Sequence, residues 1–279
     1  MKKIIKPFLS IAVVALSLTA CKKDIASDSA NKEQMPTQPG EEVQSMNARI
    51  GGYSNTLTKY DKDSLIYAND GRLAKVQHSV NSFTQYTYGF NFITAKTFEG
   101  NELRKKIVYE LDLQNNRVVE SEEHKYSYPA PNVTIHDQKW FKFEYDAEGH
   151  LKKKYNKYKT YERTNFSWGA DGNLVTIYFH DQYNEILQHI WYGRSIELDK
   201  LQMQPVRSGL DPHLKIFGKG SKNMMHILQR YPASGSTPDL LEYHNFLFNP
   251  KGYPTNCTII DGVTNKPIHS FNFSYSQSL

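Results

Sequence analysis

The chain has 279 residues, with 34 Lys and Arg against 29 Asp and Glu and a formal net charge of +5 at pH 7. Three of the lysines lie in the first twenty residues, which contain no acidic residue, so 31 basic residues face 29 acidic ones in the remainder and its net charge is only +2. A chain this close to neutrality lacks the positive surface of a nucleic-acid-binding protein, and we expect no nucleic-acid partner. Two cysteines also exclude a framework of several disulfides.

The N-terminus has the parts of a bacterial export signal. Met1 to Lys6 is positively charged, the fourteen residues from Pro7 to Ala20 are uncharged, and Cys21 follows. As a helix, fourteen residues would span about 21 Å, short of the ~30 Å hydrocarbon core, so a permanent transmembrane helix is disfavoured. Leu18-Thr19-Ala20-Cys21 resembles a lipobox, which predicts removal of residues 1–20 and lipidation of Cys21. The alternative is an ordinary secretory signal with an incidental cysteine.

Residues 21–47 have the composition of a flexible tether. From Lys22 to Asn47 no residue is aromatic, and Lys, Asp, Ser, Glu, Gln, Pro and Gly predominate, so this stretch cannot bury enough apolar surface to fold. Of the 36 aromatic residues in the chain, 35 lie from Tyr53 onward. We therefore expect one folded domain over residues 48–279. Within it Cys257 has no disulfide partner, and the apolar residues that follow predict a buried, inert thiol.

Alternation of apolar and polar residues predicts strands throughout this domain. Phe141, Phe143 and Tyr145 alternate with Lys142 and Glu144, a period of two that puts one set of side chains on each face of a sheet. The same period recurs over residues 86–90 and 271–275. Helical periodicity is nearly absent outside residues 196–230, where we expect one short helical or irregular excursion. The fold class is therefore all-β.

A recurring turn pattern predicts how these strands are connected. An aromatic residue is followed four positions later by glycine, at Gly71, Gly149, Gly172 and Gly252. In Tyr145-Asp146-Ala147-Glu148-Gly149 the aspartate suits the start of a type I turn and the glycine suits a bulge residue with positive φ, so we expect a hairpin loop of three residues. Repeated hairpins of one design predict a single antiparallel meander that forms a β-barrel or a strongly curved sheet.

Two resemblances follow from these motifs. Tyr-Asp-x-x-Gly-x-Leu is similar to the tyrosine-aspartate repeat of large β-cage toxins, but its copies here are few and unevenly spaced. A closer resemblance is to a family of uncharacterised Bacteroidota lipoproteins with a porin-like fold, which share the lipobox, early tyrosine-rich hairpins, a segment like 217–223 and a late turn like 248–255. This resemblance implies a single antiparallel barrel or curved sheet, and it implies no catalytic residue.

Motifs with catalytic chemistry are not found. Gly218-Lys219-Gly220-Ser221-Lys222 suggests a phosphate-binding loop, but the Walker pattern places glycine where His213 stands and Ser or Thr where Gly220 stands. None of the ten histidines lies in a His-Glu-x-x-His motif, and no Gly-x-Ser-x-Gly motif is present. We therefore expect no catalytic residue, no metal site and no cofactor.

Trp140 and Trp191 are the residues we single out for ligand binding, because aromatic rings stack on the apolar faces of sugars; packing in the core is the competing interpretation. The function expected is that of a lipid-anchored envelope protein, a non-catalytic binding or structural module at the outer membrane. Its partners would be the membrane, through the lipid on Cys21, and a glycan or an envelope protein. The alternatives are a glycan-degrading enzyme and a membrane-spanning β-barrel. Lys22 after the cysteine favours the outer membrane, on either its surface or its periplasmic face.

Overall fold

The computed structural model describes residues 55–130, 133–183, 185–201, 207–233 and 237–277. The predicted signal peptide, Cys21 and the tether lie outside the described residues. No helical segment in the part of the chain that the structure describes has the length and apolarity needed to traverse a membrane.

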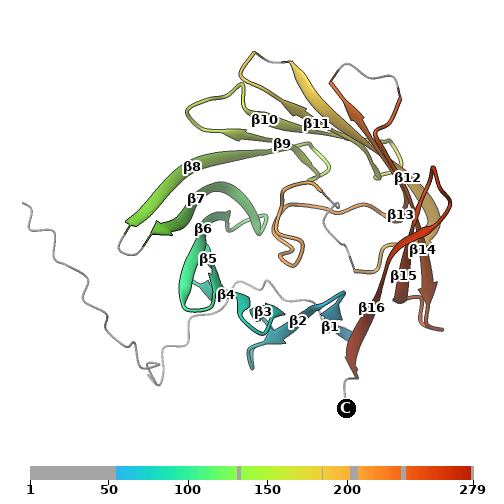
Figure 1. Cartoon of the computed structure of the whole chain (residues 1–279), viewed down its shortest axis with the longest axis horizontal. Coiled ribbons are helices and arrows are strands. Elements are labelled where there is room, and N and C mark those ends of the chain that lie inside the picture. The colour runs from blue at the N-terminus through green and yellow to red at the C-terminus, as the bar shows by residue number, and fades with distance from the viewer. Residues whose placement is uncertain (1–54, 131–132, 184, 202–206, 234–236, 278–279) are drawn as a thin grey trace, which may run out of the picture. The chain divides into compact units, whose positions relative to one another are not determined.

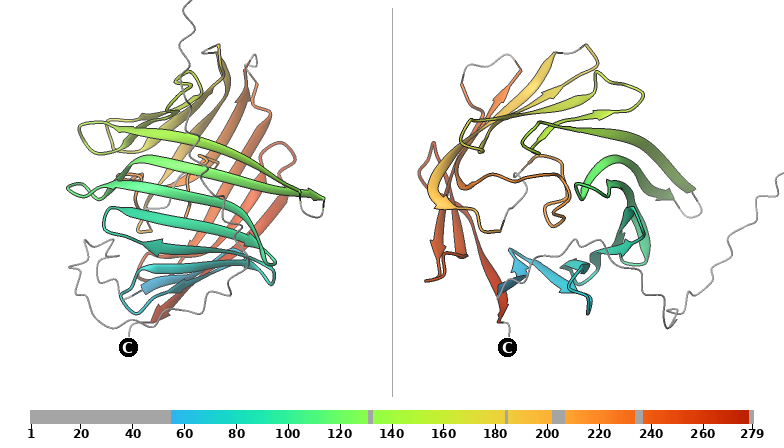
Figure 2. Two further views of the ribbon diagram at one scale, coloured as in Figure 1. Left: turned by 90° about the vertical axis from the view of Figure 1, so that its left-hand side faces the viewer. Right: turned by 180° about the vertical axis from the view of Figure 1, so that it is seen from behind.

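Sixteen antiparallel strands form one closed barrel, in which each strand pairs with its neighbours in sequence and β1 pairs with β16 (Figures 1 and 2). The strands are β1 (Asn55–Tyr60), β2 (Asp63–Tyr67), β3 (Leu73–Ser79), β4 (Ser82–Tyr88), β5 (Phe92–Glu99), β6 (Glu102–Asp112), β7 (Arg117–Ala130), β8 (Val133–Tyr145), β9 (Leu151–Asn156), β10 (Arg163–Trp168), β11 (Leu174–His180), β12 (Ile186–Leu198), β13 (Asn223–Pro232), β14 (Leu240–Phe248), β15 (Pro254–Asp261) and β16 (Pro267–Gln277). The predicted all-β meander is confirmed, and of its two predicted forms the barrel is the one observed.

The predicted excursion near residues 196–230 is irregular in its described part. Strand β12 continues to Leu198 and strand β13 begins at Asn223, so the connection covers residues 199–222. Its described residues contain turns, bends and two isolated bridges, and no helix. The residues from Asn223 onward, which also fall within the range of the predicted excursion, form a strand because they pair with both β12 and β14.

The hairpins after β2, β8, β10 and β14 share one hydrogen-bond pattern. At the β8–β9 turn the amide of Asp146 donates to the carbonyl of His150 at 3.0 Å, and the amide of Gly149 donates to the carbonyl of Asp146 at 3.1 Å. Gly149 has a φ of 92°, and Gly71, Gly172 and Gly252 have φ values of 80°, 78° and 76°. A β-bulge follows each turn, as in a type I turn with a glycine bulge.

The aromatic residue that precedes several of these turns also caps a neighbouring strand. The hydroxyl of Tyr145, at the end of β8, donates to the carbonyl of Val118 at the start of β7 at 2.7 Å. The indole Nε1–H of Trp168, at the end of β10, donates to the carbonyl of Leu151 at 2.7 Å. Both acceptors lie beside a shift in strand register, where a bulge interrupts the ladder. The repeated aromatic residue therefore has a hydrogen-bonding role in addition to packing.

Residues 207–222, which we call the inner segment, lie inside the ring of strands (Figures 1 and 2). The amide of Val118 donates to the carbonyl of Ile216 at 2.8 Å, and the amide of Lys219 donates to the carbonyl of Gly149 at 2.9 Å. Ile216 and Phe217 belong to the main core cluster with wall residues of many strands. The inner segment thus blocks one end of the barrel, which we call the plugged end. This end carries the hairpins 68–72, 146–150, 169–173 and 249–253. The opposite end, which carries the turns 61–62, 80–81 and 100–101, is called the far end.

Candidate functional site

A cavity of about 220 Å³ lies between the inner segment and the barrel wall formed by β2 to β9. Residues paired across adjacent strands share one face of a sheet, so register decides which side chains reach the lumen. Thr84, Thr97 and Lys105 form one such row, and Tyr86 pairs with Ala95 in the next row. All five line the cavity. Because Thr84 and Thr97 lie within a few residues of the turns 80–81 and 100–101, the cavity is displaced toward the far end.

A chain of hydrogen bonds runs along one wall of this cavity. Asp63 Oδ1 lies 3.0 Å from His78 Nδ1, His78 Nε2 lies 2.9 Å from Thr84 Oγ1, and Thr84 Oγ1 lies 2.9 Å from Thr97 Oγ1. The other carboxylate oxygen of Asp63 lies 3.1 Å from His213 Nε2 of the inner segment. This network therefore joins strands β2 to β5 to the inner segment.

The network fixes the charge state of its carboxyl group. Burial would raise the pKa of Asp63, but hydrogen bonds from His213 and His78 hold it below its usual range. A group whose pKa is lower in the folded chain than in the unfolded chain contributes stability above the unfolded pKa of about 4 and loses it as the pH falls through the folded value. Asp63 is thus an anion at neutral pH that holds two imidazoles in place.

The order carboxylate, imidazole, hydroxyl is also that of a nucleophilic triad. Such a site needs donors for the developing oxyanion, which are usually backbone amides. Thr84 stands within a strand that is paired on both sides, with Val76 and with Thr97, so the amides around it are used in the ladders of the sheet. This geometry suits groups that orient a bound molecule better than it suits acyl transfer.

A second set of polar contacts positions the tip of the inner segment. The hydroxyl of Tyr86 donates to Asp211 Oδ2 at 2.9 Å, and the amide of His213 donates to Asp211 Oδ1 at 2.9 Å. Tyr109, Phe143 and Phe217 add aromatic surface to the same cavity. A concave site that combines apolar rings with a few convergent polar groups is typical of small-molecule binding.

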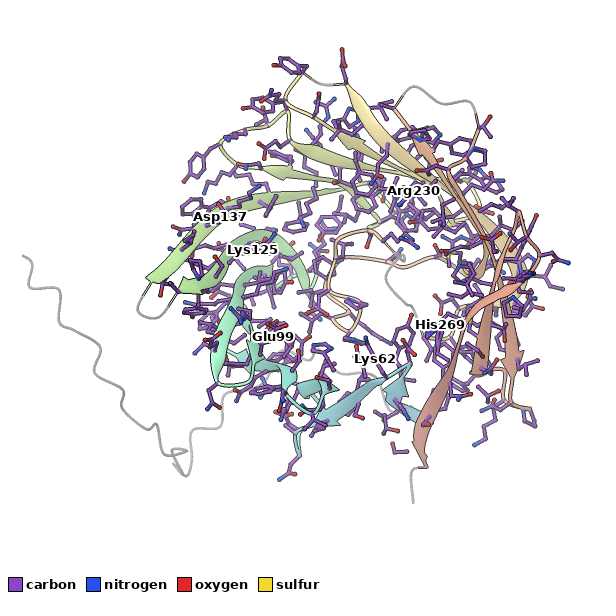
Figure 3. The ribbon with its side chains drawn as sticks, in the orientation of Figure 1. Lys62, Glu99, Lys125, Asp137, Arg230 and His269 are labelled. Atoms are coloured by element: carbon purple, nitrogen blue, oxygen red, sulfur yellow. The ribbon has the colours of Figure 1, made fainter. Side chains whose placement is uncertain are left out.

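Several lysines surround a single carboxylate, that of Glu123, on the cavity wall near the far end of the barrel. Glu123 Oε1 lies 3.4 Å from the Nζ atoms of both Lys105 and Lys125, the latter labelled in Figure 3. Burial would raise the pKa of Glu123, but Lys105, Lys154 and Lys125 hold it below its usual range. Burial, together with the like charges of Lys105 and Lys125, lowers the pKa of Lys154 to about 8 in spite of Glu123. Positive charge at this end therefore exceeds what one carboxylate offsets.

Another polar group lies on the wall formed by β13 and β14. Glu242 Oε2 lies 3.1 Å from His244 Nε2, and the guanidinium of Arg207 donates to Glu242 Oε1 at 2.8 Å. The hydrogen bond from His244 and the charge of Arg207 hold the pKa of Glu242 below its usual range against the effect of burial. Both carboxylate oxygens are satisfied, which indicates that this group anchors Arg207 at the start of the inner segment.

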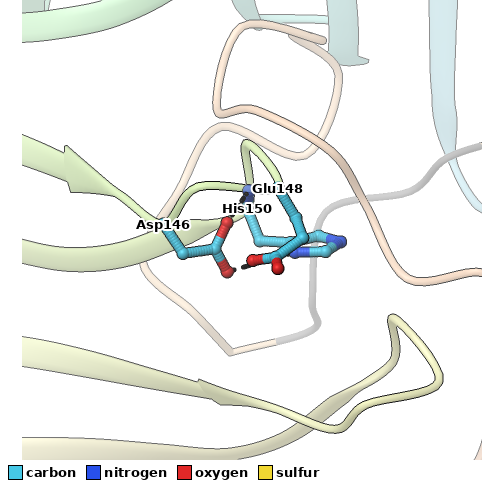
Figure 4. A group of neighbouring side chains, drawn as sticks. All are labelled: Asp146, Glu148 and His150. Atoms are coloured by element: carbon cyan, nitrogen blue, oxygen red, sulfur yellow. Dashed lines mark hydrogen bonds and ion pairs between the residues drawn. The ribbon is translucent and has the colours of Figure 1, made fainter.

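Asp146, Glu148 and His150 form a cluster of metal-ligating types at the plugged end (Figure 4). Their ligand atoms lie within 4.8 Å of one another. The backbone amide of His150 donates to Asp146 Oδ1 at 2.8 Å, and the ring atom Nδ1 of His150 lies 3.2 Å from Asp146 Oδ2. The His150 ring also stacks on Trp168, with centroids 4.5 Å apart. These contacts account for Asp146 and His150 as parts of the hairpin.

The residues singled out from the sequence lie elsewhere. Trp140 pairs with Glu122, one position from the lumen-facing Phe141, so it belongs to the outer face, where its ring meets Tyr158 edge to face at 5.3 Å. Trp191 is 36% exposed on β12, which is separated from β8 by three strands. The structure does not bring the two tryptophans together, and neither lines the lumen cavity.

Cys257 is fully buried among the side chains of the second core cluster. Burial raises the pKa of its thiol to about 12, so the thiolate is not formed at neutral pH. Such a thiol packs as a small apolar group and is a poor nucleophile.

The residues of the cavity itself were not identified from sequence. Asp63, His78 and Thr84 come from three strands, and no spacing in the chain relates them. The available signal was the alternation within each strand, which shows that Thr84 and Tyr86 share a face but not which face is inside.

Comparisons with known proteins relate the chain to one fold. No family model matches the chain, and no curated protein matches it. Among solved structures, it is similar to a porin-like protein from Bacteroides uniformis ATCC 8492, with a TM-score of 0.55 and 13% sequence identity over 77% of this chain and 90% of that one. At this level of identity the likeness shows a shared porin-like barrel fold.

Proposed function

We propose that this protein is a lipid-anchored binding protein of the bacterial envelope, which holds one small polar unit of a glycan in its lumen cavity. The observation that carries the proposal is the cavity of about 220 Å³ between the wall and the inner segment. Its hydroxyl, imidazole and carboxylate groups suit sugar hydroxyls, and its aromatic side chains suit the apolar faces of sugar rings.

The filling of the lumen favours binding over conduction. Ile216 and Phe217 of the inner segment pack with Ile177 and Leu228 of the wall in one core cluster, and each of the four is at most 2% exposed. Backbone hydrogen bonds also join the inner segment to Val118 and to the hairpins at Gly149 and Gly172. A channel needs a continuous aqueous path, whereas this lumen has a packed plug with a cavity on one side of it.

The outer face favours a lipid anchor over a membrane-spanning barrel. One outward row crosses five adjacent strands through polar or charged side chains: Gln85, Lys96, Lys106, His124 and Gln138. A second outward row contains Glu110, Glu120, Lys142, Tyr155 and Arg163. Lysine or arginine facing lipid at mid-bilayer costs about 2–4 kcal/mol per residue. Such a surface is suited to water, and the lipid on Cys21 would then attach the barrel to the membrane.

Binding should be saturable and should depend on the lumen. We expect the mature protein to bind fragments of envelope glycans in isothermal titration calorimetry and to release them unchanged. Thr97→Phe places a ring in the cavity and should abolish binding. Lys96→Phe, one residue away on the outer face, is the matched control and should retain it. Binding by Thr97→Phe equal to that of wild type would contradict the proposal, and released reducing sugar would replace it with the glycan-degrading enzyme.

Anchoring should depend on one thiol. We expect Cys21→Ala to abolish incorporation of a labelled fatty acid in growing cells, because thioether linkage needs the sulfur at that position. Cys257→Ala removes the other cysteine of the chain and should leave incorporation unchanged. Label on the Cys21→Ala protein would refute the lipobox interpretation. Protease treatment of intact cells then distinguishes the two faces of the outer membrane, because a protected domain would be periplasmic.

A further inference from the structure

The lumen face of strands β6 to β9 carries more positive than negative side chains near the far end. By register, Lys105, Lys125 and Asp137 form one inward row, in which Lys125 and Asp137 are neighbours (Figure 3). Ile107, Glu123 and Lys139 form the next row, and Lys154 pairs with the buried Phe143. Four lysines therefore share this face with two carboxylates, which leaves two positive charges without a carboxylate.

On the outer face of the same strands, acidic and basic side chains form ion pairs with one another. Glu120 lies 3.2 Å from Lys142 Nζ and 2.8 Å from Lys157 Nζ. These exposed pairs are also screened by water and salt. The surplus of lysine on the inner face is therefore a local feature of the lumen and not a general property of these strands.

Lys154 is the lysine that a bound anion would stabilise most. Its Nζ lies 4.5 Å from the centroid of the Phe141 ring and 6.0 Å from that of Phe143. Its hydrogen-bond acceptor is the carbonyl of Gly209, at 3.3 Å, on the inner segment. The carboxylate that acts on Lys154, that of Glu123, is shared with Lys105 and Lys125, and aromatic faces and one neutral carbonyl hold a cation weakly compared with a carboxylate. An anion placed beside Lys154 would gain a charge-assisted hydrogen bond in a partly desolvated site.

The acidic side chains on the other side of the cavity, Asp63 and Asp211, do not need a bound cation. Asp63 is engaged by His78 and His213, and Asp211 is engaged by Tyr86 and by the amide of His213. These acids are satisfied by protein donors. The positive charge that protein carboxylates do not offset lies around Glu123, where Lys105 and Lys154 line the cavity and Lys125 lies beside them.

We infer that the molecule bound in the lumen bears an acidic group, a carboxylate or a phosphate, and that Lys105 and Lys154 bind that group while the rest of the molecule contacts the polar wall at Thr84 and Thr97. This inference rests on the proposed binding function and specifies its ligand class. An acidic sugar of the uronic type fits both the charge of this end and the hydroxyl-rich wall.

The test is calorimetric titration of the mature protein with D-glucuronate, D-glucose and inorganic phosphate. We expect D-glucuronate to bind at least ten times more tightly than D-glucose. Lys154→Gln should weaken D-glucuronate binding by a factor of ten or more and leave the weak binding of D-glucose unchanged. Lys154→Arg, which keeps the positive charge, should bind D-glucuronate as wild type does. Lys153→Gln is the matched control, because Lys153 faces outward beside Glu144 and Tyr155, and it should bind as wild type does.

The outcomes separate this inference from the function on which it rests. Equal affinity for D-glucose and D-glucuronate would overturn the acidic ligand and leave the glycan-binding proposal intact. Failure of both sugars and of larger envelope glycans to bind would overturn the proposed function. Binding of phosphate that is lost in Lys154→Gln, without binding of D-glucuronate, would support the anion site and identify a phosphate-bearing ligand. If Lys154→Gln does not fold, Lys105→Gln at the more exposed position provides the same comparison.

Discussion

Replacing Gly218 with alanine should destabilise the barrel by about 2–4 kcal/mol. Gly218 has a φ of 80°, a conformation that costs a residue with a Cβ on the order of 1 kcal/mol. The Cβ atom would also contact the carbonyl oxygen of Gly149 and lie 2.8 Å from the Tyr145 ring. The first neighbour is backbone and cannot rotate away, so the inner segment would have to withdraw from the β8–β9 hairpin.

Gly71→Ala is the matched control for this prediction. Gly71 also has a φ of 80°, but nothing lies within 4 Å of the position its Cβ would take. Its substitution should therefore cost only the conformational term of about 1 kcal/mol. Denaturant unfolding of both variants measures the difference. Equal losses of free energy would mean that Gly218 does not contact the hairpin as described.

The local parts of this fold could be predicted from the sequence because they depend on neighbouring residues. The alternation of Phe141, Phe143 and Tyr145 with charged residues is sufficient for a strand, and Asp146 with Gly149 is sufficient for the turn that follows it. A meander needs only such local pairings, since each strand pairs with the next. Closure of the barrel is different, because β1 and β16 are separated by about 200 residues and no local pattern relates Leu57 to Tyr275.

The lumen site could not be predicted because it depends on register and on facing. A shift of one residue would exchange every inward side chain for an outward one. Trp140 and Phe141 illustrate the difficulty: both are aromatic, one faces out and the next faces in. Where both faces of a sheet carry aromatic residues, ring content alone does not distinguish a ligand platform from a core residue, which is why Trp140 and Trp191 were predicted to bind a ligand although neither lines the lumen cavity.

The inner segment was recognised only as an interruption. The sequence predicts one short helical or irregular excursion there, but the hydrogen bond between Val118 and Ile216 joins residues almost 100 positions apart. A long connection in a compact domain is commonly functional, and this length was the available sequence signal. Its apolar residues at Leu214, Ile216 and Phe217 are those that the structure buries.

Replacing Phe217 with alanine should lower the free energy of unfolding by about 3–5 kcal/mol. Phe217 is 2% exposed and meets Tyr109 edge to face, with centroids 5.7 Å apart, and Phe143 at 5.9 Å. Truncation leaves a void between the inner segment and the wall, and the sheet around it is too constrained to collapse onto the void. Phe98→Ala is the matched control, because Phe98 stacks on Phe83 at 5.0 Å on the outer face and should cost about 1 kcal/mol.

Hydrogen exchange distinguishes a detached segment from a weakened barrel. The amide of Val118 donates to the carbonyl of Ile216, and the amide of Lys219 donates to the carbonyl of Gly149, so both report on docking of the inner segment. In Phe217→Ala these two amides should lose protection well before those of central strands such as β5 and β6, because undocking is a smaller opening than unfolding. Equal loss of protection in β5 and at Val118 would mean that the segment and the wall open together. The lumen cavity would then exist only in the intact barrel and could not be opened by movement of the inner segment alone.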